Sequence, residues 1–190
     1  MKDEELSDEK LVEKSLAGAE TAFELLVQRY YKRIISIIYQ IIGNIQDAED
    51  IAQEVFIKVY RNLNSFNRKA EFSTWLYRIA VNTTYNCLKK QKRHLPLDYI
   101  QRSDVLKKDS REELESKERQ DLIRKAIERL PFKFRSTIVL KEIEGLSYKD
   151  IAKTLGCRIG TVESRLFRAR EMLKKILFPI LKKEEKDELC

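Results

Sequence analysis

Three residues in the C-terminal third of the chain, Ala152, Gly156 and Val162, constrain its fold more than any others. A small residue lets two helices cross closely, and a glycine four positions later can take the positive φ of a tight turn. A valine six positions further on can pack into the angle between the helices. Aliphatic residues at helical spacing complete a core around the crossing: Ile151, Leu155 and Leu166. The spacing therefore predicts a helix-turn-helix.

The second helix of this motif is expected to begin near Gly160 and to place its N-terminal residues in the major groove of DNA. Along it, basic side chains outnumber acidic ones, with Arg165, Arg168, Arg170, Lys174 and Lys175 against Glu163 and Glu171. A solvated helix in a bundle without a ligand would also be charged. The basic excess together with the turn spacing favours DNA binding, but many kinds of regulator share this motif.

Apolar residues recur at helical spacing over most of the chain, and Gly and Pro are rare, at five and three residues. The pattern predicts an all-α fold. In the N-terminal half, helices are expected over residues 8–16, 20–42 and 73–92, with another opened by an N-cap at Asn44. In the C-terminal half, one helix is expected before Pro131, a second up to Gly145, and a third after a capping box that starts at Ser147.

A charged stretch at residues 96–117 has few bulky apolar side chains and separates two helical modules. Such a stretch buries too little surface to fix one conformation, so it is expected to be a flexible linker. The sequence therefore predicts two small helical domains, at residues 1–95 and 118–182, followed by a charged tail at residues 183–190.

The chain is basic, with 38 Lys and Arg against 31 Asp and Glu and a net charge of +7, which favours a polyanionic partner. Cys87, Cys157 and Cys190 are far apart in sequence, so free thiols in a reducing cytoplasm are expected rather than a zinc site or disulfides. No apolar run is long enough to cross a membrane, and the acidic start is unlike a signal peptide. A single His without a nucleophile motif or phosphate loop predicts no enzyme and no cofactor.

Residues 72–97 contain no acidic side chain at all. The cations and aromatics of this stretch are Arg78, Lys89, Lys90, Lys92, Arg93, His94, Trp75, Tyr77 and Tyr85. Aromatic side chains beside cations hold the unstacked bases of single strands along a charged track. Trp75 also fits an ordinary core position, whereas the basic cluster at the end of the stretch fits contact with a nucleic-acid backbone.

Three stretches carry a family resemblance: DAEDIAQEVF at residues 47–56, FSTWLYRIAVN at residues 72–82, and residues 145–170. In this order they resemble the polymerase-binding helix, the promoter-melting helix and domain four of the extracytoplasmic-function (ECF) sigma factors, the compact branch of the bacterial sigma family. The first module thus resembles sigma domain two and the second sigma domain four. The resemblance implies a subunit that binds core RNA polymerase and directs promoter-specific transcription initiation, for example in a stress response.

The resemblance also implies contacts, residue by residue. Asp50, Gln53 and Glu54 match positions that bind the clamp helices of the polymerase β′ subunit, and their spacing puts them on one helical face. Asn82 matches a residue that holds a base flipped from the minus-ten element, since an amide can both donate to and accept from a base edge. Phe66 lies where the family builds that pocket, although a loop aromatic folded onto the core is an equal alternative.

The remaining minus-ten contacts implied are Trp75, Arg78, Lys89, Lys90 and Arg93. The minus-thirty-five contacts implied are Arg158, Thr161, Ser164, Arg165, Phe167 and Arg168, in a domain that also meets the polymerase β flap. Glu163 departs from the many relatives with Lys or Arg there, which leaves the minus-thirty-five sequence open. The two elements lie roughly 17 base pairs or ~58 Å apart, within the ~75 Å reach of a linker of about 22 residues.

Family members are commonly held inactive by an anti-sigma protein, so such a partner is expected, with the chain in the cytoplasm or sequestered at the inner membrane face. Two other functions stay open. A helix-turn-helix regulator with an unrelated helical input domain would bind a palindromic operator without polymerase, although the acid-free stretch argues against it. A metal nuclease would need convergent carboxylates, for which the acids of residues 47–54 are the candidates.

Overall fold

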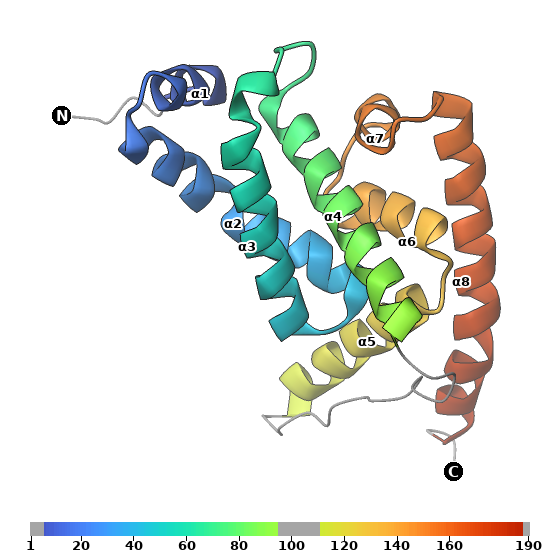
Figure 1. The fold of residues 1–190 in the computed structure, drawn as a ribbon. Helices are drawn as coiled ribbons and strands as arrows, with labels where there is room; N and C mark the ends of the chain where they lie inside the picture. Colours follow the sequence, from blue (N-terminus) through green and yellow to red (C-terminus); the bar gives the residue numbers. More distant parts are fainter. Residues whose placement is uncertain (1–5, 95–110, 188–190) are drawn as a thin grey trace.

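The structure is a computed structural model that describes residues 6–94 and 111–187. Within these ranges the chain forms helices and no strands, which confirms the all-α prediction (Figure 1). The helices are α1 (Asp8–Leu16), α2 (Glu20–Ile42), α3 (Ile45–Arg61), the 3-10 helix η1 (Leu63–Ser65), α4 (Phe72–His94), α5 (Arg111–Glu128), α6 (Phe132–Ile138), the π-helix η2 (Val139–Ile143), α7 (Tyr148–Leu155) and α8 (Ile159–Asp187).

The N-terminal domain consists of α1 to α4 and is built around α2, which packs against the other three helices. An apolar stripe at helical spacing makes α2 the centre, because it buries one continuous face: Leu26, Tyr30, Ile34, Ile37, Ile38 and Ile41. Gly43 ends α2 with a φ of 81°. Asn44 then caps α3, since its side-chain oxygen accepts from the Asp47 backbone N–H at 3.0 Å, as expected from the sequence.

The C-terminal domain consists of α5 to α8 and contains the predicted helix-turn-helix. The Ser147 hydroxyl caps α7 by accepting from the Asp150 backbone N–H at 3.1 Å. Gly156 makes the turn with a φ of 60°, and Val162 of α8 is fully buried. Ala152 is 7% exposed at the crossing of α7 and α8. The three residues that constrained the fold therefore have the predicted roles.

Three boundaries differ from the sequence-based expectation. The helix expected up to Gly145 becomes α6 followed by the π-helix η2, in which Glu144 N–H donates to the Val139 carbonyl at 3.2 Å. Just before η2, the Thr137 hydroxyl bonds to the Lys133 carbonyl at 2.6 Å, an interaction that bends helices. Helix α5 starts at Arg111, inside the expected linker, and α8 runs into the expected tail. Residues 95–110, most of that linker, lie outside the described residues.

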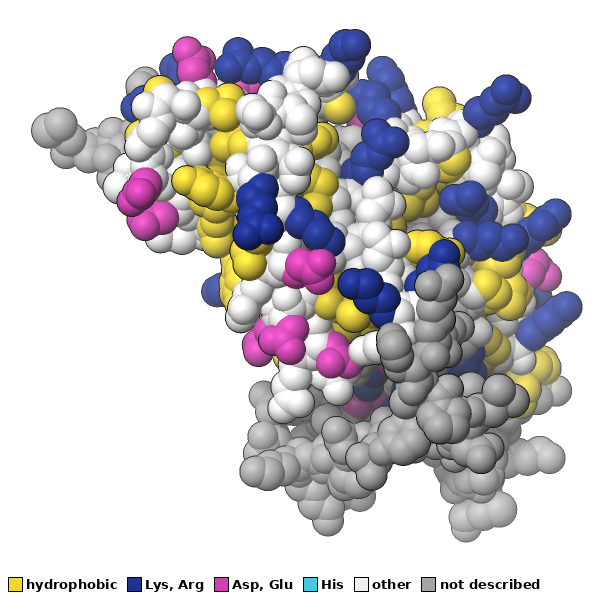
Figure 2. Space-filling model, viewed as in Figure 1, with side chains coloured by type: hydrophobic (Ala, Val, Ile, Leu, Met, Phe, Trp, Pro, Cys, Tyr) yellow, Lys and Arg dark blue, Asp and Glu magenta, His cyan; other side chains and the backbone are white. Residues whose placement is uncertain are grey.

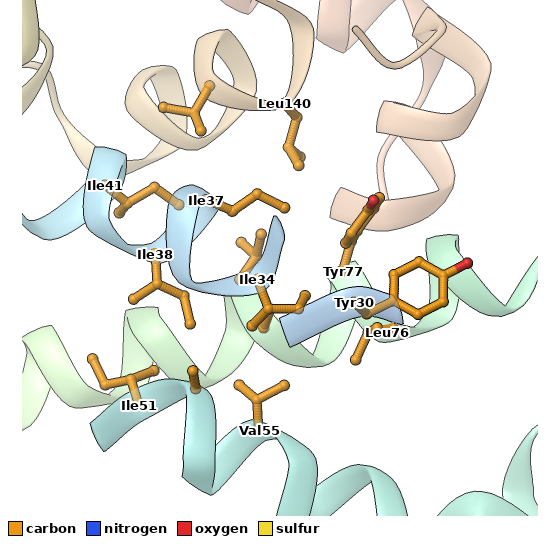
Figure 3. Close-up of a cluster of buried hydrophobic side chains, with 14 of the residues drawn as sticks. Tyr30, Ile34, Ile37, Ile38, Ile41, Ile51, Val55, Leu76, Tyr77 and Leu140 are labelled. Atoms are coloured by element: carbon orange, nitrogen blue, oxygen red, sulfur yellow. The ribbon is translucent and has the colours of Figure 1, made fainter. Parts of the chain in front are cut away.

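The two domains pack directly against each other, which the sequence did not predict. Helix α2 contacts α5, α6 and η2, and α4 contacts α7 (Figure 1). The buried apolar side chains of both domains form one cluster. In Figure 3, Leu140 of η2 lies beside Ile37 and near Ile41 of α2. The core of the N-terminal domain thus continues into the C-terminal domain without a break.

Candidate functional site

Helix α3 presents the first group of predicted site residues on its exposed side. Asp50, Gln53 and Glu54 are all exposed and share one helical face, while Ile51, Val55 and Val59 are buried on the opposite face. Glu54 forms a salt bridge of 2.7 Å with Lys58. The three side chains therefore form a single exposed polar patch that a partner can reach. Figure 2 shows acidic side chains over the lower part of α3.

Sequence reasoning missed two apolar residues next to this patch. Ile57 is 52% exposed and Tyr60 is 57% exposed, although both are large and hydrophobic. Tyr60 packs edge-on against Phe23, with ring centroids 4.9 Å apart. The sequence did indicate that both residues would be exposed, because neither lies on the helical stripe of Ile51, Val55 and Val59. Exposed apolar side chains beside a polar patch are typical of a protein-binding surface.

Helix α4 carries the second group. Five residues at helical spacing line one side of it and are called the α4 stripe here: Trp75, Arg78, Asn82, Tyr85 and Lys89. All are exposed except Trp75, which is partly buried. Lys90 is exposed beside the stripe, and the side chain of Arg93 lies outside the described residues. The structure thus places four of the predicted minus-ten residues on one face and adds Tyr85.

Phe66 lies in the segment before α4 and is only 8% exposed. Its ring packs against Phe72 and Trp75, with centroid distances of 5.6 Å and 5.4 Å. Tyr30 of α2 extends the same aromatic cluster, with its ring 5.7 Å from that of Phe72. Phe66 therefore anchors its segment to the core and supports Trp75, and its contact with a flipped base stays a prediction.

The N-terminal half of α8 carries the third group. Arg158, just before α8, lies in line with Thr161, Arg165 and Arg168 of α8 at helical spacing, and Ser164 is next to this stripe. Val162, Leu166 and Ala169 are buried on the adjoining face and hold α8 against the domain, and Thr161 and Arg165 are partly buried beside them. Phe167 is 68% exposed at the edge of the stripe. Figure 2 shows Lys and Arg side chains gathered over α8.

Several features of the described residues bear on other kinds of site. No group of three His, Cys, Asp or Glu side chains among them is arranged to hold a metal ion. Across residues 6–94 and 111–187, no helix is long and apolar enough to cross a bilayer. Cys87 and Cys157 are free thiols, and Cys190 lies outside the described ranges. An open pocket of about 440 Å³ lies between Asp8, Arg29 and Tyr30, next to the start of α4.

Family models match both domains. Residues 26–94 match the model for sigma-70 region 2, and residues 120–173 match the model for sigma-70 region 4. The RNA polymerase sigma-H factor of Pseudomonas aeruginosa is 41% identical to this chain, over 92% of this chain and 96% of its own length. The chain belongs to the ECF family of RNA polymerase sigma factors. It is a subunit that binds core RNA polymerase and promoter DNA and directs promoter-specific initiation of transcription.

Further relatives agree with this assignment. The ECF RNA polymerase sigma-E factor of Escherichia coli K12 is 40% identical, over 95% of this chain and 99% of its own length. Two solved structures share the fold at 24% identity. CnrH in complex with the cytosolic domain of CnrY has a TM-score of 0.69, covering 90% of this chain and 97% of CnrH. The sigma factor RpoE in complex with the anti-sigma factor NepR from Bartonella quintana has a TM-score of 0.65, covering 82% of this chain and 96% of RpoE.

Family membership decides between the functions that the sequence left open. A regulator that acts without joining polymerase does not have two sigma domains in this order, so that alternative is set aside. The family consists of transcription initiation factors, and a chain that is not an enzyme is consistent with it.

Proposed function

We propose that three surfaces of this sigma factor act together at a promoter. The α3 patch of Asp50, Gln53 and Glu54 docks on the β′ clamp helices. The α4 stripe, with Lys90 and Arg93, holds the unstacked minus-ten strand, and Asn82 binds a flipped base in a pocket that Phe66 supports. Flipping a base costs a few kcal/mol, which stacking and polymerase contacts offset. The outer stripe of α8 reads the minus-thirty-five duplex while its domain rests on the β flap.

The observation that carries this proposal is the α4 stripe. Its cations and aromatics alternate along one exposed side of a helix that contains no acidic residue. A single strand needs both kinds of side chain, because cations hold its phosphates and aromatic faces take the place of neighbouring bases. Packing of the core does not require alternating cations and aromatics on the exposed side of the helix.

Within this proposal, sigma domain two spans residues 1–95 and sigma domain four spans residues 118–182, with a linker at 96–117 and a tail at 183–190. The protein acts without catalytic chemistry of its own. It works in the cytoplasm and is held inactive there, or at the inner membrane face, by an anti-sigma protein. Support for such a partner comes from RpoE, whose solved structure includes the anti-sigma factor NepR.

Run-off transcription tests the proposal. Purified core polymerase is mixed with the full chain and a library of promoter templates, and the transcripts are sequenced. We expect specific transcripts that appear only with the protein and that fall strongly for the variant Asp50→Ala/Gln53→Ala/Glu54→Ala. Affinity for core polymerase should fall in parallel, because the variant removes the docking patch without touching a buried side chain.

A matched control removes two acids and one polar group elsewhere. Glu20→Ala/Thr21→Ala/Glu24→Ala changes three exposed residues at the start of α2, away from the α3 patch. The control should transcribe like the wild type. If the α3 variant also joins polymerase and transcribes normally, the assigned docking patch is wrong. Transcripts that start without the protein would show that the assay does not depend on it.

A further inference from the structure

One side of α8 points away from the core of its domain. The buried residues of the helix, Val162, Leu166 and Ala169, define its inner side. The opposite side consists of exposed residues at the spacing i, i+3, i+4 and i+7 and is called the front of α8 here: Gly160, Glu163, Ser164 and Phe167. Because α8 runs along the edge of the molecule (Figure 1), a large partner can reach this side.

Glu163, on the front of α8, has no electrostatic partner that would explain its charge. It forms no salt bridge with any residue that the structure describes. The positions three and four residues away along the helix hold no cation: Ile159, Gly160, Leu166 and Phe167. The nearby Arg170 is paired with Glu142 at 2.8 Å. Nor does Glu163 lie in the first turn of α8, where the helix dipole stabilises an acid. The charge of Glu163 is therefore accessible to a partner outside the chain.

The first turn of α8 allows DNA to approach Glu163 closely. A Cβ atom on Gly160 would meet nothing within 4 Å, so the fold itself does not require a glycine at this position. Without a side chain there, a DNA duplex can lie against the first turn, and Glu163 and Ser164 are the next side chains along the front. The exposed Arg158 and Arg168 supply cations for adjacent phosphates, which offsets the repulsion between Glu163 and the DNA backbone.

The chemistry of the major groove determines what a carboxylate on the front of α8 can bind. An ionised carboxylate only accepts hydrogen bonds. Guanine presents only acceptors to the major groove, and thymine presents an acceptor with a methyl group, so both repel a carboxylate. Adenine presents an amine beside the acceptor N7, whereas cytosine presents its N4 amine alone. Cytosine is therefore the base that Glu163 fits best.

We propose that Glu163 is a specificity-determining residue of this sigma factor, and that its carboxylate accepts a hydrogen bond from the N4 amine of a cytosine in the minus-thirty-five element. This inference rests on the proposed function of α8 as the helix that reads this duplex. It names one base pair of the element, which family membership does not give: a C·G pair whose cytosine faces Glu163.

Exchange of one base preference for another tests this inference. Templates randomised over the minus-thirty-five element, each with a barcode in the transcribed region, are transcribed by core polymerase with the full chain, and the transcripts are sequenced. We expect one position at which the wild type prefers cytosine, on one strand, over every other base by about fivefold or more. Glu163→Arg should invert this pair to G·C, because a guanidinium donates to guanine O6 and N7. Glu163→Gln should change it to A·T, because an amide pairs with adenine N6 and N7.

Glu171→Gln is the matched control, since it neutralises an exposed acid about two turns further along α8. It should keep cytosine at the selected position. The wild type and the three variants should have the same helical circular dichroism signal and similar melting temperatures, because both acids are exposed and buried residues on the other side hold α8 in place.

A changed base preference separates base recognition from simple electrostatics. If Glu163→Arg and Glu163→Gln raise transcription from all templates and leave the preferred base unchanged at every position, Glu163 only repels phosphates and the inference is wrong. It is also wrong if the variants alter a position at which the wild type prefers a base other than cytosine.

Failure of the proposed function has a different signature. If randomising the minus-thirty-five element has no effect on transcription by the wild type, while Asp50→Ala/Gln53→Ala/Glu54→Ala still abolishes it, α8 does not read this element. The proposed role of α8 then fails, and the inference on Glu163 with it, whereas the docking patch on α3 stands.

Discussion

Asn82 occupies the middle of the α4 stripe, and its side chain is exposed. We expect Asn82→Ala to reduce transcription roughly 5- to 150-fold, because a base edge that loses its amide partner gives up ~1–3 kcal/mol. Affinity for core polymerase should not change, since the proposed polymerase contact lies on α3. Run-off transcription and a core-binding assay on the same preparation measure the two effects.

Gln28→Ala is the matched control for Asn82→Ala, because it removes an exposed amide from α2. It should transcribe like the wild type. Equal loss in both variants would mean that the amide of Asn82 has no specific role. A loss of polymerase affinity in Asn82→Ala would point instead to a disturbed N-terminal domain.

The sequence predicted the position of some site residues but not of others. The positions of Asp50, Gln53 and Glu54 on one face followed from helical spacing alone. Phe66 did not, because a phenylalanine in a loop has the same sequence signature whether it faces a ligand or packs on the core. Its burial against Phe72 and Trp75 depends on how the segment from η1 to α4 folds back, which no local pattern encodes.

At the scale of helices and turns, the junction of α7 and α8 tests the role of backbone conformation. We expect Gly156→Ala to lower the free energy of unfolding by ~1–2 kcal/mol, because an alanine at a φ of 60° is in the left-handed region. The new methyl group would also lie 3.3 Å from Arg78 Nη2. Denaturant unfolding followed by circular dichroism measures the change.

Gly160→Ala is the control, four residues away in the first turn of α8. Its Cβ would meet open space, and an alanine in a helix is favoured over glycine by ~0.5–1 kcal/mol. The two variants should therefore shift stability in opposite directions. A similar loss in both would mean that the loss reflects the added methyl group rather than the left-handed turn.

Helix ends were predictable where a side chain marks them. Asn44 and Ser147 cap α3 and α7 as their sequence positions indicate, because a capping hydrogen bond joins residues three apart. The π-helix η2 was not predictable from spacing, since an apolar pattern cannot distinguish a wider turn from a normal one. Likewise α5 begins within a stretch whose composition favours a linker, because composition alone says little about helix content.

At the scale of the whole molecule, the packing of the two domains could not be predicted from the sequence. The contacts from Arg135 to Ile41 and from Arg124 to Gly43 join residues 94 and 81 positions apart. The apolar residues of the interface, such as Leu140 and Ile37, would fit equally well into the core of their own domain. The sequence-based prediction of two helical domains was therefore correct, but it did not include the interface between them.

Glu144, at the end of η2, is buried where the two domains meet, and its Oε2 lies 3.3 Å from Arg33 Nε of α2. The packing of the two domains should therefore depend on pH. Burial raises the pKa of this carboxyl above its usual range, although Arg33 and the hydrogen bond with Tyr77 act in the opposite direction. If the domains separate, Glu144 becomes solvated and its pKa returns towards the ordinary value of 4.5. The packed form therefore binds the proton more tightly, so the packing of the domains should strengthen as pH falls through the raised pKa of Glu144 and weaken above it.

We expect the radius of gyration of the full chain to decrease as the pH is lowered from about 7.5 towards 5, while the helical circular dichroism signal stays constant. Glu144→Gln should abolish this dependence and keep the domains packed at both pH values, because a neutral amide can be buried beside Arg33 and Tyr77 without the cost of burying a charge. This separates it from Glu144→Arg, which places two cations together and should separate the domains at every pH. A radius that rises on acidification, with the helices intact, would mean that the attraction of Arg33 outweighs the burial of Glu144 and that the ionised pair holds the domains together.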